Sequence, residues 1–229
     1  MKSVAFIPVR GGSKSIPGKN IKLFNGHPLV YWTALAAQKC QHITDIVIAT
    51  DDSEIAETVE KFGFSKLSVY HRSAQNANDT ASTESVILEY LSQAKSNPRD
   101  PFVLIQATNP MLMEADLNRG FELFNQQPHG SVISCATFKR FIWNRNGTAA
   151  NYDFKNRPRR QDFEGILLEN GAFYINSVEN ILTHKNRLSE PIQICEMGEN
   201  TSFEIDEPED WLILEKIHKK HFSNTETQL

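Results

Sequence analysis

Short apolar runs rich in β-branched residues alternate with helical patterns through the first 138 residues, and this alternation limits the fold more than any other feature of the sequence. It predicts a doubly wound α/β fold, in which helices cover both faces of a mainly parallel sheet. Ser53 is the expected N-cap of the second helix. The predicted strands are 3–9, 45–50, 67–72, 102–108 and 130–138, and the predicted helices are 28–40, 53–63, 80–95 and 114–127.

The ligand-binding edge of such a sheet can be placed in advance. Ligands bind at the carboxyl ends of the strands, beside the point where the strand order reverses. The first predicted strand leads directly into Arg10, and Gln106 lies near the end of strand 102–108. Both side chains are therefore expected at this edge.

The second part of the chain departs from the alternation. Residues 139–170 are polar, basic and poor in helical periodicity, and we interpret them as an excursion outside the main sheet, partly a hairpin. Strand character returns at 167–178 around an expected turn at Asn170-Gly171, and a last helix is expected to begin near Pro208. We predict a single domain, 1–229, with an inserted subregion at about 139–170.

Composition and charge argue against several classes of protein. The 229 residues are 40% hydrophobic and 23% charged, with a formal net charge of −4 that gives no support for nucleic-acid binding. No apolar run approaches the roughly 18 residues of a membrane span, and the N-terminal one is too short for a signal peptide. Cys40, Cys135 and Cys195 are odd in number and widely spaced, as in reduced proteins. We expect a cytoplasmic protein that binds neither nucleic acid nor membranes, with a nuclear location open only for a eukaryotic source.

The stretch RGGSKSIPGKN, residues 10–20, combines glycines with cationic side chains directly after the first strand. It is not a Walker A loop, because its glycine spacing is one residue too long and Asn20 stands where that motif has Ser or Thr; the dinucleotide fingerprint GxGxxG is also absent. Glycines nevertheless let backbone N–H groups approach an anion closely. Arg10, Lys14 and Lys19 would add charge-assisted hydrogen bonds to a triphosphate. A solvated, positively charged turn is the alternative interpretation.

Two further charged clusters lie downstream. RPRRQD, residues 157–162, contains three arginines, which suit phosphate or carboxylate recognition and stabilise negative charge during phosphoryl transfer. In FEIDEPED, residues 203–210, Glu204 and Asp206 share one face if the segment is a strand, and such a pair suits magnesium bound to substrate phosphates. A solvated or targeting basic run and an exposed acidic turn are the alternatives. Together with the loop, the clusters indicate a nucleotide triphosphate and a metal.

Five motifs, in this order along the chain, resemble those of one family. The CMP-sialic acid synthetases (acylneuraminate cytidylyltransferases) are similar over nearly the whole chain to about residue 215, and RPRRQDFEGILLENGAFY is particularly similar to their animal-type branch. The motifs are RGGSKSIPGKN, HRSAQNANDTAST (71–83), LIQATNP (104–110), RPRRQD with ENGAFY (169–174), and FEID followed by Asp210-Trp211.

The resemblance implies a Rossmann-like nucleotidyltransferase fold and an Mg2+-dependent reaction. CTP and a nine-carbon α-keto acid sugar, N-acetylneuraminate or KDN (the deaminated sialic acid), would give the CMP-sugar and pyrophosphate, with the C2 hydroxyl attacking the α-phosphate. Such chemistry needs mainly positioning and charge stabilisation. With the anion-binding features of the loop, the resemblance assigns nucleotide binding to seven residues: Arg10, Gly11, Lys14, Lys19, Asn20, Arg72 and Thr83. It assigns sugar binding to Gln106, Arg160 and Gln161, and catalysis to Lys19, Arg159 and Arg160. Asp206 and Glu204 would bind magnesium.

Several residues depart from the family pattern. Ser15 replaces a usual glycine, which restricts the loop, and Glu204 replaces a usual aspartate, which lengthens a side chain expected at the metal. Asn109 and Met111-Leu112 replace the Ser and Leu-Arg of a bacterial form, so that an arginine contact is missing there.

The family also implies an assembly, because its excursion carries dimer contacts and one subunit can complete its neighbour's site. A homodimer or a dimer of dimers is therefore expected. The aromatic residues Phe138, Phe141 and Trp143 fit this use, and a locally packed hairpin fits them equally.

Two functional alternatives remain: a cytidylyltransferase for legionaminate, pseudaminate or Kdo, and a nucleotide-binding regulator without catalysis, against which the intact motif residues argue.

Overall fold

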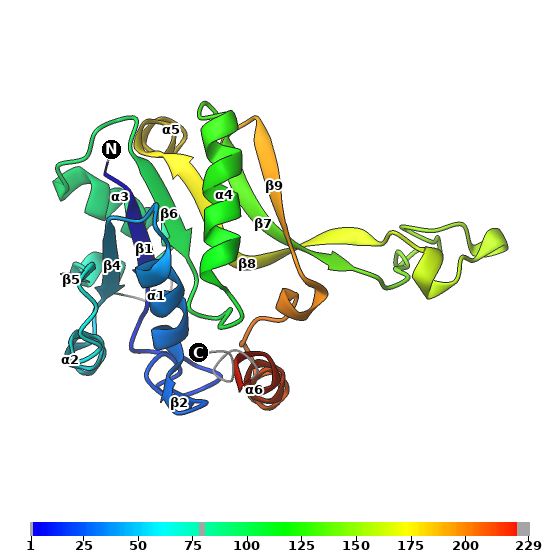
Figure 1. Cartoon of the computed structure of the whole chain (residues 1–229), viewed down its shortest axis with the longest axis horizontal. Coiled ribbons are helices and arrows are strands. Elements are labelled where there is room, and N and C mark those ends of the chain that lie inside the picture. Colours follow the sequence, from blue (N-terminus) through cyan, green and yellow to red (C-terminus); the bar gives the residue numbers. More distant parts are fainter. Residues whose placement is uncertain (1, 78–80, 224–229) are drawn as a thin grey trace.

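The computed structural model describes residues 2–77 and 81–223. In this part of the chain the main sheet has seven strands in the order β5-β4-β1-β6-β8-β7-β9, and β2 and β3 form a separate hairpin (Figure 1). The pairs β1–β4, β1–β6, β4–β5 and β7–β9 are parallel, whereas β8 runs antiparallel to β6 and β7. The predicted mainly parallel sheet is confirmed. The strands are β1 Val4–Pro8, β2 Leu23–Phe24, β3 His27–Pro28, β4 Asp45–Thr50, β5 Leu67–His71, β6 Pro101–Ile105, β7 Ser131–Phe138, β8 Ile166–Ser177 and β9 Ile192–Met197.

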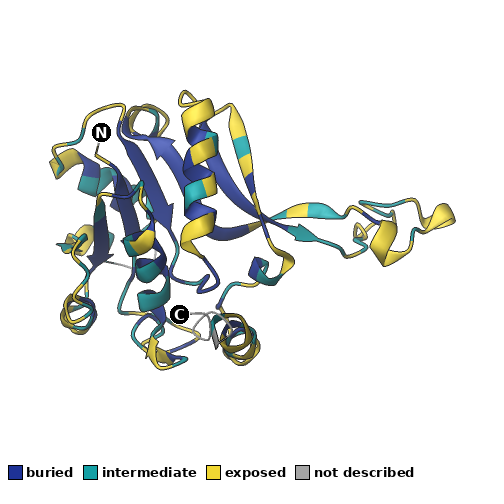
Figure 2. Ribbon diagram, in the orientation of Figure 1, coloured by how far each residue is buried: buried dark blue, intermediate teal, exposed yellow. Residues whose placement is uncertain are grey.

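Helices cover both faces of the sheet, and β1 shows why. Its side chains alternate, so that Ala5 and Ile7 share one buried cluster with α1, α2 and α4, while Val4 and Phe6 share another with α3 and α5. The sheet is accordingly the most buried part of the molecule (Figure 2). The helices are α1 Leu29–Lys39, α2 Ser53–Glu60, α3 Thr83–Gln93, α4 Glu114–Gln126, α5 Val178–His184 and α6 Pro208–Ser223, with 3-10 turns η1 Ala74–Asn76, η2 Phe154–Asn156, η3 Arg160–Asp162 and η4 Glu199–Thr201. Residue 80 of the predicted helix 80–95 lies outside the described residues.

A third apolar cluster attaches α6 to the glycine-rich loop. Ile16 of the loop and Phe24 of the β2–β3 hairpin belong to it, as do residues just before and within α6. The cluster therefore brings the acidic segment 203–206 next to residues 10–20. Its buried members are Ile16, Phe24, Leu29, Met111, Ile205, Trp211 and Leu214.

Two local predictions are wrong. The N-cap of α2 is Asp52 and not Ser53: Asp52 Oδ1 accepts hydrogen bonds from the backbone N–H groups of Glu54 and Ile55 at 2.8 and 3.1 Å. The expected turn at Asn170-Gly171 does not form, since β8 continues through both residues. Gly171 has a φ of +63°, and the pairing of β8 with β7 shifts register nearby. A positive-φ glycine here belongs to a bulge within a strand.

The final strand assignments also differ from the prediction. The edge strand β9 was not predicted, and the segment 203–206 that holds Glu204 and Asp206 is not a strand. Both carboxylates are instead placed by an irregular segment, which the backbone N–H of Ile205 attaches to the carbonyl of Thr108 at 2.8 Å.

Residues 139–165 form an arm that the extended ends of β7 and β8 carry away from the sheet (Figure 1). Within it, Trp143 pairs with Ala149 in an isolated antiparallel bridge, and the ring of Phe141 lies against Tyr152 and Phe163. Among the described residues, no helix combines the length and the apolar character needed to cross a membrane.

Candidate active site

The carboxyl ends of β1, β5 and β6 border a cleft of about 250 Å³. Six residues predicted to bind nucleotide or sugar line it together: Arg10, Lys19, Asn20, Arg72, Thr83 and Gln106. They come from the ends of these strands, from the glycine-rich loop and from the first turn of α3. The remaining wall is formed by residues to which the sequence assigned no role, although four of them lie in the motifs at 71–83 and 104–110: Pro8, Ala81, Ser82, Val86, Ala107 and Thr108.

The glycine-rich loop closes on itself through Asn20. This side chain is buried, and its Nδ2 donates a hydrogen bond to the carbonyl of Arg10 at 3.0 Å. Gly18 has a φ of +62°, and its carbonyl accepts hydrogen bonds from the N–H groups of Ile21 and Lys22. Asn20 thus joins the two ends of the loop, which gives it a structural role beside the predicted contact with nucleotide.

Gly11 is required by its contact with the start of α2. A Cβ at this position would lie 2.2 Å from Oδ2 of Asp52, the side chain that caps the helix. The adjacent Gly12 has no atom within 4 Å of the same position. The first glycine therefore packs the loop against α2, whereas the second faces open space.

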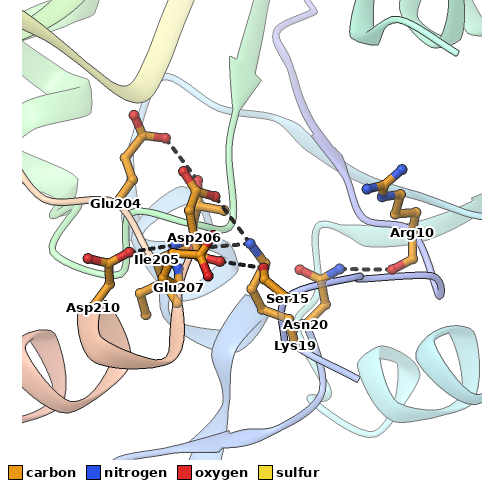
Figure 3. Close-up of polar contacts among 10 residues, drawn as sticks. Arg10, Ser15, Lys19, Asn20, Glu204, Ile205, Asp206, Glu207 and Asp210 are labelled. Atoms are coloured by element: carbon orange, nitrogen blue, oxygen red, sulfur yellow. Dashed lines mark hydrogen bonds and ion pairs between the residues drawn. The ribbon is translucent and has the colours of Figure 1, made fainter. Parts of the chain in front are cut away.

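Lys19 connects the loop to the acidic segment (Figure 3). Its Nζ donates a hydrogen bond to the carbonyl of Ile205 at 2.7 Å and lies 3.4 Å from Oδ1 of Asp206. The hydroxyl of Ser15 donates to the carbonyl of Asp206. Ser15, which stands where a glycine was expected from the family resemblance, thus supplies a second attachment of the loop to this segment. The glycine-rich loop and the acidic segment, far apart in the sequence, therefore lie in direct contact.

Glu204 and Gln106 converge on Gly171. A Cβ on this glycine would lie 2.5 Å from Oε2 of Glu204 and 2.7 Å from Oε1 of Gln106, so only glycine leaves this space open. Thr108 Oγ1 donates to Glu204 Oε2 at 3.2 Å. Burial raises the pKa of Glu204; its hydrogen bond with Thr108 opposes the shift, and the charges of Asp206 and Glu169 add to it.

The acidic pair has the chemistry of a magnesium site. Mg2+ prefers hard oxygen ligands and usually takes one or two carboxylates besides phosphates and water. The mutual repulsion of Glu204 and Asp206, which contributes to the raised pKa of Glu204, is what a bound cation would relieve. Within the described residues, no group of three or more His, Cys, Asp or Glu side chains is placed to hold a metal. The oxygen donors of Glu204 and Asp206 fit magnesium by their chemistry.

Arg72 is held rigidly at the cleft. Its Nε and Nη2 donate to the carbonyl of Ala49 at 3.0 and 2.8 Å. Burial lowers the pKa of Arg72; the nearby Asp51 opposes the shift, and the positive charge of Arg10 adds to it. Two cations held close together at one cleft favour an anionic ligand.

The arm arginines lie outside the cleft of their own chain. Arg159 Nε is 2.7 Å from Oδ2 of Asp162, and Arg160 Nη2 is 3.0 Å from Oε1 of Glu199. Gln161 belongs to the same 3-10 turn. Lys14, exposed on the glycine-rich loop, and Gly11 are also absent from the cleft wall. We predicted one site for all of these residues. Within a single chain, however, the arm holds Arg159, Arg160 and Gln161 away from the cleft.

The fold and this site define a class of protein. A doubly wound sheet that places a cationic, glycine-rich loop and an acidic pair at the carboxyl edge of its strands is an arrangement of nucleotide-binding α/β proteins. The same fold occurs in a solved structure of CMP-2-keto-3-deoxy-manno-octonic acid synthetase complexed with CTP, which matches with a TM-score of 0.70 at 19% identity and covers 96% of this chain and 100% of that one.

The chain belongs to the cytidylyltransferase family, whose sequence profile matches residues 4–223. It is 34% identical over 220 residues to an N-acylneuraminate cytidylyltransferase of Oncorhynchus mykiss, which is 93% of this chain but 49% of the relative. The chain thus spans about half the length of that protein. A CMP-N,N'-diacetyllegionaminic acid synthase of Legionella pneumophila is 28% identical over 226 residues, 95% of this chain and 96% of the relative. The family resemblance drawn from the five motifs is confirmed.

Proposed function

We propose that the protein is a cytidylyltransferase that activates a nine-carbon α-keto acid sugar, N-acetylneuraminate or KDN, with CTP to give the CMP-sugar and pyrophosphate. The observation that carries this proposal is the single cleft in which Arg10, Lys19, Arg72, Thr83 and Gln106 meet. The similarity to a relative named N-acylneuraminate cytidylyltransferase supports the choice of sugar.

Different residues of the cleft bind different parts of the two substrates. Arg10 and Lys19 bind the triphosphate through charge-assisted hydrogen bonds, Arg72 and Thr83 contact the cytidine part, and Gln106 orients the sugar. The oxygen of the sugar's C2 hydroxyl forms a bond to the α-phosphorus, and the bond from that phosphorus to the pyrophosphate oxygen breaks. Pyrophosphate leaves with the electron pair, and a base accepts the hydroxyl proton. The cationic side chains stabilise the negative charge that develops.

Asp206 and Glu204 would hold magnesium. When bound, the metal supplies positive charge to the phosphates. Lys19, which already contacts Asp206, would lie between this carboxylate and the triphosphate. Its hydrogen bond to Ile205 fixes the ammonium group at that position.

The arm supports a homodimer, or a dimer of dimers, as the active form. Trp143 and Phe154 expose about half of their surfaces there, at 50% and 58%, and their ring centroids lie 6.1 Å apart; contiguous exposed apolar surface of this kind marks interaction sites. Arg159 and Arg160 do not line their own cleft. We therefore place them, with Gln161, in the site of a neighbouring subunit, where they would stabilise the transition state or bind the sugar carboxylate.

The three cysteines support a place in the cytoplasm. Cys40, Cys135 and Cys195 are free and buried, and burial raises the pKa of each thiol. Free thiols are typical of reducing compartments.

A panel of acidic sugars tests the function. Pyrophosphate release is measured with CTP, Mg2+ and N-acetylneuraminate, KDN, legionaminate, pseudaminate or Kdo, and kcat/KM is compared. We expect N-acetylneuraminate or KDN to give the highest value. A higher value for legionaminate would favour the second candidate, which the similarity to the Legionella pneumophila enzyme over nearly the whole of both chains supports. Binding of CTP without release of pyrophosphate from any sugar would indicate a regulator.

A further inference from the structure

Glu89, in the second half of α3, accepts hydrogen bonds from three residues of the segment that ends β5 and continues into η1. Its Oε1 accepts from the hydroxyl of Tyr70 at 2.7 Å and from the backbone N–H of Ser73 at 2.9 Å. Its Oε2 accepts from the hydroxyl of Ser73 at 2.6 Å and from Nδ2 of Asn76. One carboxylate thus fixes residues 70–76 to α3. No sequence motif marked it.

The two parts joined by Glu89 both contribute to the cleft wall. Residues 70–76 include Arg72, directly before Ser73, and the first turn of α3 includes Thr83. A second contact reinforces the connection, because Ser85 Oγ donates to Oδ1 of Asn76 at 2.8 Å. This set of hydrogen bonds therefore adds to those that Arg72 makes with Ala49 and Thr50 of β4, and ties the segment that holds Arg72 to the helix that holds Thr83.

The charges of the cluster keep it assembled over a wide pH range. Burial alone would raise the pKa of Glu89, but the hydrogen bonds from Ser73, Tyr70 and Asn76 outweigh it and lower this pKa to about 2. Burial and the Glu89 carboxylate raise the pKa of Tyr70 to about 12. Near neutral pH the carboxylate is therefore ionised and the phenol is protonated, as the hydrogen bonds require.

We infer that Glu89 is a positioning residue of the nucleotide subsite, which holds Arg72 and Thr83 at the separation that the cytidine part of CTP requires. Glu89 does not line the cleft and acts through the segment it binds. The inference rests on the proposed function, since it assigns the cytidine part to these two residues. It predicts that loss of the carboxylate weakens binding of CTP selectively and leaves the sugar subsite and the chemical step intact.

Glu89→Gln is the sharpest test because it keeps the size of the side chain. In either orientation its amide nitrogen faces an N–H donor, from the backbone of Ser73 or from Asn76, so hydrogen bonds are lost. We expect the KM for CTP to rise about tenfold, with kcat at saturating CTP and the KM for the sugar within about twofold of wild type. Glu57→Gln, at an exposed glutamate of α2, is the matched control and should change none of these constants. Ser73→Ala removes one hydroxyl donor and should raise the KM for CTP by about threefold.

Amide hydrogen exchange and calorimetry separate the possible outcomes. Glu89→Gln should speed exchange in residues 72–77 and leave the sheet unchanged. Faster exchange with an unaltered KM for CTP would overturn the inference, because the cluster would then only stabilise the fold; a fall in kcat alone would overturn it as well. If the wild-type protein releases no pyrophosphate with any sugar, the proposed reaction is wrong. Titration with CTP then still tests the role of Glu89, because a Kd for CTP about tenfold weaker in Glu89→Gln than in the wild type supports the inference. An equal Kd, or no binding of CTP by the wild type, contradicts it.

Discussion

Gly11→Ala should reduce both stability and nucleotide affinity, for a reason that the structure defines. The new Cβ would lie 2.2 Å from Oδ2 of Asp52 and 2.9 Å from its Cβ. Rotation of the Asp52 side chain can relieve the first contact but not the second, since the Cβ position is fixed by the backbone. The loop or the start of α2 must therefore shift, and the cap that Asp52 provides to Glu54 and Ile55 is disturbed.

The size of the effect follows from these two losses. Removal of an N-cap costs about 1 kcal/mol, and a displaced, overpacked backbone contact costs on the order of 1 kcal/mol more. For a domain of this size, about 2 kcal/mol lowers Tm by roughly 4–8 °C. The shift also moves Arg10, the neighbour of Gly11, and CTP affinity should fall about tenfold if one charge-assisted contact is lost.

Thermal unfolding and CTP titration test this prediction, with Gly12→Ala as the control from the same loop. A Cβ on Gly12 has no atom within 4 Å, so this variant should keep its Tm and affinity or gain slightly in stability. In an Asp52→Gly background, Gly11→Ala should lose much of its cost, because both the carboxylate and the Cβ that the new methyl group would contact are gone. Equal Tm values and equal CTP affinities for the two glycine variants would show that the contact between Gly11 and Asp52 does not matter for stability or for binding.

Three other predictions concern the last helix, the arm and the metal. Burial lowers the pKa of His218 to about 4, below its usual value near 6.5, so the unfolded chain takes up the proton first. The free energy of unfolding should therefore fall by roughly 3 kcal/mol between pH 6.5 and 4, and an equally steep pH series of urea unfolding in His218→Leu would contradict this. Arg159→Ala should greatly reduce kcat and largely retain CTP affinity; unchanged turnover would remove Arg159 from the mechanism. Asp206→Asn should raise the Mg2+ concentration for half-maximal activity, and an unaltered titration would exclude the assigned ligand.

The features of the fold that depend on local periodicity could be predicted from the sequence. β4 has the predicted bounds, Asp45–Thr50, because its apolar run ends abruptly at two aspartates. The meeting of Arg10 and Gln106 could also be predicted, since parallel strands bring their carboxyl ends to one edge of the sheet.

The other features depend on contacts between distant segments. A positive-φ glycine gives the same local signal in a hairpin turn and in a bulge, and only the pairing of β8 with β6 and β7 shows which one Gly171 forms. β9 is an edge strand with exposed isoleucines, and its pairing with β7 leaves little local signal. A glutamate in an amphipathic helix resembles a solvated residue, so Glu89 is recognised only through its partners on β5 and η1. Ser15 is explained by a carbonyl that lies far along the chain, at Asp206.

A crystal structure of the protein with CTP and Mg2+ would show in one measurement whether the cleft binds the nucleotide as proposed. We expect the triphosphate against Arg10 and Lys19, the cytidine part against Arg72 and Thr83, and a metal ion at Asp206. CTP bound elsewhere on the chain, or a cleft without nucleotide at a saturating concentration, would contradict the proposal.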